Sequence, residues 1–240
     1  EIYTLSLHDA LPICTAWDRM DYKKALKNIV EFSIPELNYH YNIEVCQFLK
    51  HLDKDMIKSE YGVIAQNSLE HNISIAVDEM FDLYANGLRR LENAQYEDAG
   101  IRVYRMAEML GQIHLMKVGY MSDDMPMYDA ENVVKFFEYK GRKPKSRFHS
   151  SDVVEFLQFI HYNKELIDYL YYVGNKIRDL RNKSILIHGY KAQVAETEDL
   201  KNLFESLVNK TKDFISEEEF NKKKETALFL NNNFKVSNDE

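Results

Sequence analysis

The chain has 240 residues and a formal net charge of −8, and Gly and Pro together make up only about 5% of it, against an average of about 12%. So few chain-breaking residues exclude a β-sandwich, barrel or propeller and favour long helices joined by few loops. The 45% of hydrophobic residues excludes general disorder, and the acidic balance excludes a generic nucleic-acid coat. No apolar run is long enough for a membrane span, and having only Cys14 and Cys46 fits a cytoplasmic protein without a disulfide scaffold.

Residues 1–14 are expected not to belong to the natural protein. The stretch EIYTLSLHDALPI (Glu1–Ile13) resembles the translated read of a sequencing-library adapter that recurs at the edges of environmental assemblies. Because processing scars carry no information about the fold, we leave this segment out of the fold prediction. The alternative is an ordinary strand-like N-terminal segment.

Residues 15–128 are predicted to form a helical linker domain. Helices are expected over Asp21–Phe32 and over Leu37 to about Lys58, with Pro35 between them. Two longer helices follow, because apolar residues recur at steps of three and four on either side of a break at 93–95. Their stripes are Leu69, Ile73, Ala76, Met80, Leu83 and Gly87, then Ala99, Val103, Met106, Leu110 and Ile113. The spacing predicts that these two helices form an antiparallel hairpin.

Residues 129–230 are predicted to form a second helical domain, reached through a loop at 119–127. Short helices are expected over 129–139 and 151–159, separated by a polar, basic segment at 140–150. A long helix then begins near Asn163, with Gly189 at the position of its C-cap. A helix over 196–215 and a last one opened by a capping box at Ser216 precede a polar tail, 231–240. The predicted fold is therefore all-α.

One pair of residues on the long helix points to chemistry. Its apolar stripe passes through Leu180 and Ile187, and the residues directly after these two are Arg181 and His188. Seven residues turn about 700°, about 20° short of two full turns, so the guanidinium and the imidazole share one face, about 10.5 Å apart along the axis. Gly174 lies one heptad earlier on the same line and leaves little side-chain bulk there.

Such a face suits the cleavage of a phosphodiester. An arginine offers a permanent fork of donors to a phosphate and to the charge of its transition state, and a histidine accepts and donates a proton near neutral pH. No metal is needed if the neighbouring 2′-hydroxyl of RNA is the nucleophile, and DNA would then be spared. The alternative from spacing alone is a surface arginine in an ion pair and a histidine that caps the helix C-terminus.

Three segments carry a resemblance to a known family. The string IRDLRNKSILIHGY (Ile177–Tyr190) resembles the Arg-Asn-(several)-His motif of HEPN-domain ribonucleases, in the form found in CRISPR-associated HEPN proteins. The segments AWDRMDYKKAL (Ala16–Leu26) and LYANGLRRLENAQYEDAGIRVYRMAEMLGQIHL (Leu83–Leu115) are similar to the helical region before HEPN in CARF–HEPN proteins of type III systems. The resemblance covers most of the chain from Ala16 to about Glu205, in the order of the family. It implies that residues 15–128 are the family's helical linker domain and that residues 129–230 are its HEPN domain.

This resemblance implies a metal-independent endoribonuclease of CRISPR antiviral defence that acts on single-stranded RNA. Arg181 and His188 match the catalytic pair, and Asn182 matches its polar neighbour, which would bind substrate. Two HEPN domains pair in such enzymes, so a homodimer with a composite cleft is expected, and no cofactor. The family's N-terminal CARF domain binds cyclic oligoadenylate and activates the nuclease. Residues 14–60 show no Rossmann-like strand–glycine–helix start, so we do not expect that domain in this chain.

Two basic groups allow more than one interpretation. The segment 140–147 contains five cations and no acid, and it either guides an RNA backbone or, the interpretation that we favour, forms a solvated linker. Four arginines on the hairpin are expected to form inter-helix ion pairs rather than a ligand site: Arg89, Arg90, Arg102 and Arg105. The remaining histidines show no metal-ligand spacing.

Two alternatives to a CRISPR nuclease stay open. The first is a HEPN toxin or ribonuclease outside CRISPR defence, with the same chemistry and no nucleotide sensor. The second is a non-catalytic helical dimerisation or RNA-binding module, in which Arg181 and His188 only pair and cap. Neither DNA nor a membrane is expected as a partner.

Overall fold

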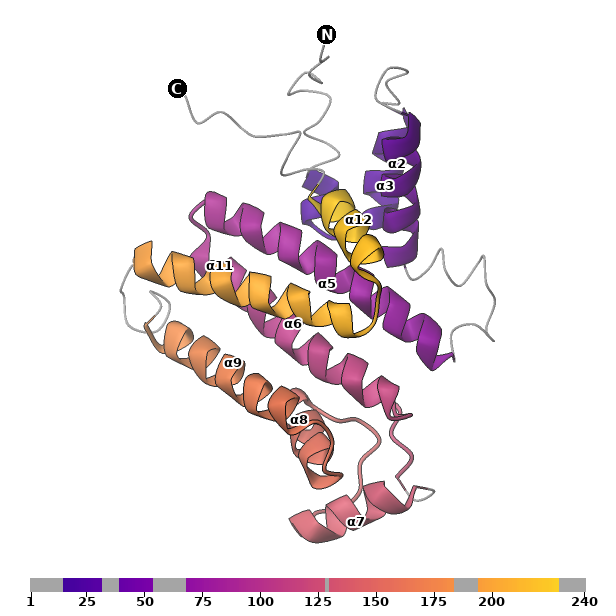
Figure 1. The fold of residues 1–240 in the computed structure, drawn as a ribbon, viewed down its shortest axis with the longest axis vertical. Helices are drawn as coiled ribbons and strands as arrows, with labels where there is room; N and C mark the ends of the chain where they lie inside the picture. Colours follow the sequence, from indigo (N-terminus) through magenta and orange to yellow (C-terminus); the bar gives the residue numbers. More distant parts are fainter. Residues whose placement is uncertain (1–14, 32–38, 54–67, 128–129, 184–193, 229–240) are drawn as a thin grey trace. The chain divides into compact units, whose positions relative to one another are not determined.

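The computed structural model describes residues 15–31, 39–53, 68–127, 130–183 and 194–228, and of residues 30–31, 39–43, 180–183 and 194–196 only the backbone. Within these ranges the chain is helical and contains no β-strand, which confirms the predicted all-α class (Figure 1). None of the described helices has both the length and the hydrophobicity to cross a bilayer.

The chain divides into two compact units. Unit 1 combines residues 1–67 with residues 212–240, and unit 2 is the continuous stretch 68–211. In unit 1, α2 (Tyr22–Glu31) and α3 (Tyr39–Leu52) pack together, and α12 (Glu217–Ala227) packs against α3. The buried Trp17 ring lies 6.3 Å from Phe48 between centroids. The Ser216 hydroxyl accepts a hydrogen bond from the N–H of Glu219, so the N-cap predicted there is confirmed.

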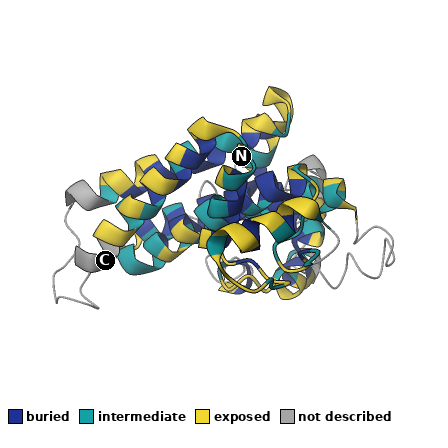
Figure 2. Cartoon of the chain, turned by 90° about the horizontal axis from the view of Figure 1, so that it is seen from below, coloured by how far each residue is buried: buried dark blue, intermediate teal, exposed yellow. Residues whose placement is uncertain are grey.

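Unit 2 is built on a helical hairpin with four further helices. The hairpin consists of α5 (Leu69–Glu92) and α6 (Tyr96–Lys117), which pack along their length and meet at a turn over 93–95. The helices that follow are α7 (Glu131–Lys140), α8 (Ser150–Phe159), α9 (Lys164–Lys183) and α11 (Val194–Asn209). A short 3₁₀ helix, η1 (Lys210–Asp213), spans the point where unit 2 ends and the second part of unit 1 begins. Figure 2 shows how burial varies along the helices. Helix α9 is buried along one side and exposed along the other, as its apolar stripe predicted, whereas α5 is buried or half-buried on all sides from Ala76 to Leu91.

The predicted helices are found, with differences at their ends. The second helix stops at Leu52 rather than near residue 58, and the helix predicted over 196–215 ends at Asn209, where the tighter η1 takes over. The junction predicted between residues 128 and 129 does not coincide with a division between the units. Side chains on both sides of it share one core, and the N–H of Met125 donates to the Ser146 carbonyl at 2.8 Å.

That shared core is a cluster of aromatic rings beneath α7 and α8. Phe136 makes edge or tilted contacts with four other phenylalanine rings, at centroid distances of 5.4–5.8 Å. Phe148 reaches the same cluster from the loop between α7 and α8, and Leu115 reaches it from the end of α6. Because buried ring pairs stabilise beyond the area that they remove from water, this cluster holds the α7–α8 region on the hairpin.

Two glycines set the distances between helices in unit 2. A Cβ at Gly87 of α5 would lie within 3.0 Å of three carbons of the buried Phe204 ring of α11. A Cβ at Gly111 of α6 would already be 3.4 Å from Val153 of α8 and 3.8 Å from Leu170 of α9. The α5–α11 contact also contains a hydrogen bond from the Tyr84 hydroxyl to Glu205, and burial together with this carboxylate raises the pKa of Tyr84.

Gly87→Ala is expected to lower the free energy of unfolding by about 1–3 kcal/mol, because the new methyl group displaces the Phe204 ring. The range is a net value: the clash with Phe204 costs more stability than the about 1 kcal/mol gained by replacing a glycine inside a helix with alanine. Gly100→Ala on α6 is the matched control, since nothing lies within 4 Å of its Cβ position, and it should stabilise. Urea unfolding of the three proteins measures the difference; midpoints that shift in the same direction would contradict the packing argument.

Candidate functional site

The helix that carries the predicted catalytic pair, α9, is held by an apolar stripe near its start. Leu166, Leu170 and Val173 are buried, and α9 packs on α6 and α8 through this side. The Asn163 side chain caps the helix by accepting from the N–H of Leu166 at 3.1 Å. These are the stripe and the start that the 3–4 spacing predicted.

Two tyrosines tie α9 to its neighbours. The Tyr169 hydroxyl donates to Ser206 of α11 at 2.8 Å, and burial raises the pKa of Tyr169 while that hydrogen bond lowers it less. The exposed Tyr171 donates to the Gln158 side chain of α8 at 3.0 Å. Helix α9 is therefore anchored on both flanks along the turns before Arg181.

The structure describes two of the three predicted site residues, and of these two only the backbone. Arg181 and Asn182 lie in the last turn of α9, where the backbone is helical, but their side chains are not described. His188 lies outside the described residues, as does Gly189. One heptad before Arg181, Gly174 is partly exposed, and no described atom lies within 4 Å of its Cβ position. The helix thus leaves open space on the line that leads to Arg181, as the sequence predicted.

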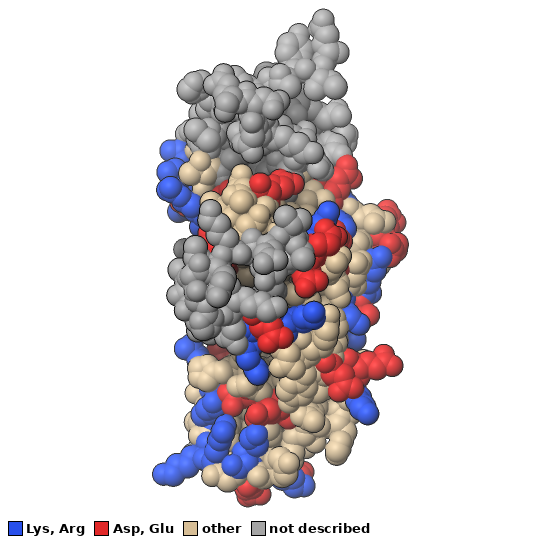
Figure 3. Space-filling model, turned by 90° about the vertical axis from the view of Figure 1, so that its left-hand side faces the viewer, with Lys and Arg blue, Asp and Glu red and all other residues tan. Residues whose placement is uncertain are grey.

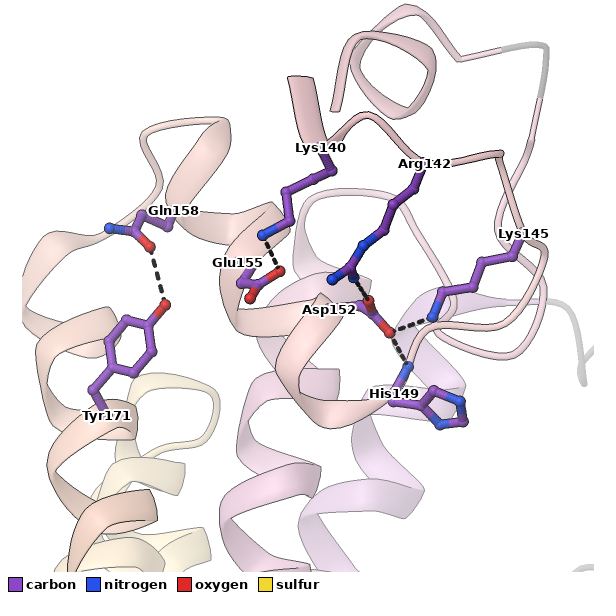
Figure 4. Close-up of polar contacts among 8 residues, drawn as sticks. All are labelled: Lys140, Arg142, Lys145, His149, Asp152, Glu155, Gln158 and Tyr171. Atoms are coloured by element: carbon purple, nitrogen blue, oxygen red, sulfur yellow. Dashed lines mark hydrogen bonds and ion pairs between the residues drawn. The ribbon is translucent and has the colours of Figure 1, made fainter. Parts of the chain in front are cut away.

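The basic segment 140–147 is tied down on α8 by ion pairs, which Figure 4 shows. Lys140 contacts Glu155 at 2.7 Å, and Lys145 contacts Asp152 at 2.7 Å. The Arg142 guanidinium is 4.0 Å from the other oxygen of Asp152. Three of the five cations are therefore engaged inside the molecule, so the segment is a fixed loop rather than the solvated linker that we favoured.

Asp152 is the centre of this arrangement. It is buried, and one oxygen accepts both from Lys145 and from the N–H of His149 at 2.9 Å, at the start of α8. Burial raises the pKa of Asp152, but these two donors outweigh it and hold the pKa below its ordinary value. The sequence analysis missed Asp152; the signal was an acid three residues into a helix, where its carboxylate can bond the backbone N–H at the helix start.

The arginines on the hairpin have partners within their own helix. Arg102 lies 3.8 Å from Asp98, and Arg105 lies 3.6 Å from Glu108, both on α6. Across the hairpin, Arg102 donates to the Asn86 amide oxygen at 2.7 Å. The ion pair of Arg105 thus lies within α6 rather than between helices, and Arg102 combines a pair within α6 with a hydrogen bond across the hairpin.

In the part of the chain that the structure describes, no three His, Cys, Asp or Glu side chains are grouped so that they could hold a metal ion. The described histidines instead make contacts of other kinds. His114, for example, is buried, and its Nδ1 lies 3.2 Å from the Tyr162 hydroxyl.

A comparison with protein families finds a match over residues 67–215 to the family described as the Csm6 HEPN domain. The chain belongs to this CRISPR-associated HEPN family. The matched range nearly coincides with unit 2, contains the Arg181–His188 motif, and begins well before residue 129, where the HEPN domain was predicted to start. A comparison with curated proteins found no match.

Membership of the HEPN family carries a general function. HEPN domains are in general ribonucleases, and the family implies RNA as substrate and, typically, action as a dimer. The hairpin α5–α6 lies inside the HEPN match, although the sequence assigned it to a linker domain. The helix that carries Arg181 therefore packs on elements of the same domain.

Asp152→Asn is expected to lower the free energy of unfolding by about 1–2 kcal/mol at pH 7, because the charge that Lys145 contacts is lost. The pKa of Asp152 is lower in the folded protein than in the unfolded one. Its carboxylate therefore stabilises the fold fully at pH values above the unfolded pKa of about 3.9, and this stabilisation is lost as the pH falls through the folded pKa. The gap between the two proteins should therefore narrow from pH 7 to about pH 3.

Urea unfolding across this pH range measures the gap. Glu155→Gln is the control: it breaks the more exposed pair with Lys140, so the loss should stay below about 1 kcal/mol. A loss in Asp152→Asn that does not change with pH would contradict the role given to its charge.

Proposed function

We propose that this chain is the nuclease part of a CRISPR-associated endoribonuclease that cleaves single-stranded RNA without a metal ion. The observation that carries the proposal is the HEPN family match, which spans α9 and the Arg181–His188 motif. The open position at Gly174 supports access to the same side of the helix. A HEPN ribonuclease outside CRISPR defence is less well supported, because the matching family is a CRISPR-associated one.

In the proposed reaction the 2′-hydroxyl of RNA attacks the adjacent phosphorus. His188 accepts the hydroxyl proton as the new O–P bond forms, and it passes this proton to the leaving 5′-oxygen as the bond from that oxygen to phosphorus breaks. Arg181 holds the phosphate and stabilises the extra charge of the transition state, and Asn182 orients the substrate or the backbone. The products are a 2′,3′-cyclic phosphate and a free 5′-hydroxyl.

The site is proposed to be complete only in a homodimer. On the helix that the sequence predicts, Arg181 and His188 lie about 10.5 Å apart along the axis, which is far for a single phosphate. The same two residues from a second chain would bring a guanidinium and an imidazole together on one scissile bond. In the parent protein, cyclic oligoadenylate bound to a CARF domain would favour this arrangement.

Purified protein incubated with labelled RNA in EDTA is expected to cleave it, and Arg181→Ala or His188→Ala should slow cleavage at least about 100-fold. Arg178→Ala, one turn earlier on α9, and His161→Asn, which suits the positive φ of 53° there, are matched controls that should keep activity. Equal rates in all variants would identify the chain as a non-catalytic module.

The mechanism and the dimer predict two further observations. RNA with a single 2′-deoxy residue at the cleavage site should be bound and not cut, and the normal product should carry a 2′,3′-cyclic phosphate. Cleavage per mole of protein should fall when the protein is diluted below the concentration at which size-exclusion chromatography with light scattering shows monomers. Constant specific activity across that transition would contradict a composite site.

A further inference from the structure

A second surface of unit 2 combines free cations with an exposed aromatic platform. We name it the basic–aromatic surface and define it by Tyr139, Arg142, Lys143 and Arg147. We propose that it binds the backbone and a base of single-stranded RNA outside the cleavage site. This inference rests on the proposed function, because it gives the same enzyme a second contact with its substrate.

Two of the three cations of this surface, Lys143 and Arg147, are not engaged by the internal ion pairs described above. Lys143 and Arg147 are exposed and form no ion pair with the described residues. The Arg142 side chain is 63% exposed, and its distance to Asp152, 4.0 Å, is long for an ion pair. Figure 3 shows Lys and Arg side chains gathered at the lower end of the view, where α7 lies in Figure 1. Lys143 and Arg147 are therefore available to phosphates, and Arg142 lies beside them with its side chain largely exposed.

The acids nearby do not cancel these charges. Residues 131–155 contain six Lys or Arg and four Asp or Glu, in a chain whose net charge is −8. Glu131 pairs with Lys135, and Asp152 and Glu155 hold the loop through the pairs described above. Glu138 is the remaining acid of residues 131–155, so this stretch keeps a net positive charge in a chain that is acidic as a whole. Two further acids, Asp123 and Asp124, lie on the neighbouring loop, whose Ser122 and Met125 form hydrogen bonds with Phe148 and Ser146.

The aromatic part is Tyr139, whose side chain is 75% exposed at the end of α7. Its ring leans on Phe159 of α8, 5.6 Å away between centroids with the planes 38° apart. The contact with Phe159 holds one side of the ring in place, and the other side is exposed to water. Covering this apolar surface with a partner would be favourable. Unstacked bases are such partners, and a ring beside cations is the arrangement that single-strand binding proteins use.

The loop between these groups is preorganised. Gly141 takes the left-handed conformation, with φ of 60°, and ends α7, while the N–H of Phe148 donates to the Ser122 carbonyl at 2.6 Å. With Phe148 buried in the core and Asp152 holding Lys145, both ends of the loop are fixed. Cations on a fixed loop lose little conformational freedom on binding, which favours a ligand with a regular spacing of charges.

The position of the surface sets the length of RNA that it serves. Phe159 ends α8, just before α9 begins at Lys164, and Arg181 lies about 25 Å further along α9. A strand at a stacked spacing of about 3.4 Å needs about seven nucleotides to cover that distance. The surface should therefore strengthen the binding of long strands and leave very short ones unaffected.

The test measures binding of fully 2′-O-methylated RNA, which lacks the 2′-hydroxyl and cannot be cut, by fluorescence anisotropy at several salt concentrations. For a strand of about 20 nucleotides, Lys143→Gln with Arg147→Gln should weaken binding about fivefold to tenfold and lower the salt slope by about 1.4, and Tyr139→Ala should weaken it at least about fivefold. Lys201→Gln, at an exposed lysine of α11, is the control for the loss of a positive charge outside this surface.

A strand of about four nucleotides should bind equally to every variant, because it is too short to reach from the cleavage site to the basic–aromatic surface. Equal affinity of wild type and variants for the long strand, or no binding by wild type, overturns the proposal. So does a loss of dimer mass in the variants with unchanged RNA affinity, which would identify the surface as a protein contact. Loss of cleavage of natural RNA with retained binding would instead refute the proposed catalysis and leave this surface supported.

Discussion

The contact between α9 and the helices beneath it is the interaction on which the rest of unit 2 depends. Gly111 of α6 lets Val153 of α8 and Leu170 of α9 approach its backbone, and Leu166 and Val173 fill the same seam. A fully buried side chain of this kind contributes about 1.5–3 kcal/mol. The burial fixes the rotation of α9 about its axis, and that rotation decides which residues of its last turns face the hairpin and which face away from it.

Ion pairs fix the shape of the loop between α7 and α8. The buried carboxylate of Asp152 gathers Lys145, Arg142 and the N–H of His149, and Glu155 takes Lys140. The acids of α8 thereby turn a run of positive charge into a loop of defined shape. A loop whose charges were all free would repel itself, whereas this one keeps its outward cations on a rigid support.

Much of this architecture follows from spacing alone. Apolar steps of three and four located α5, α6 and α9, and the acids after Ser216 located the start of α12. The domain junction could not be predicted from composition. The stretch at 140–150 is mostly polar, but it contains Phe148, whose ring packs in the core that both sides of the predicted junction share. For the site, the motif supplied Arg181, Asn182 and His188, but the role of Asp152 depends on which cations reach it, and a sequence pattern does not contain that information.

The division of the chain has a consequence for its synthesis. Unit 2 is continuous, so all of its helices have left the ribosome once residue 211 is clear of the exit tunnel. Unit 1 draws α2 and α3 from before that stretch and α12 from after it, with Lys222 reaching Glu44 at 2.9 Å. Helices α2 and α3 must therefore wait for α12, and during that interval the side of α3 that receives α12 is not yet covered by it.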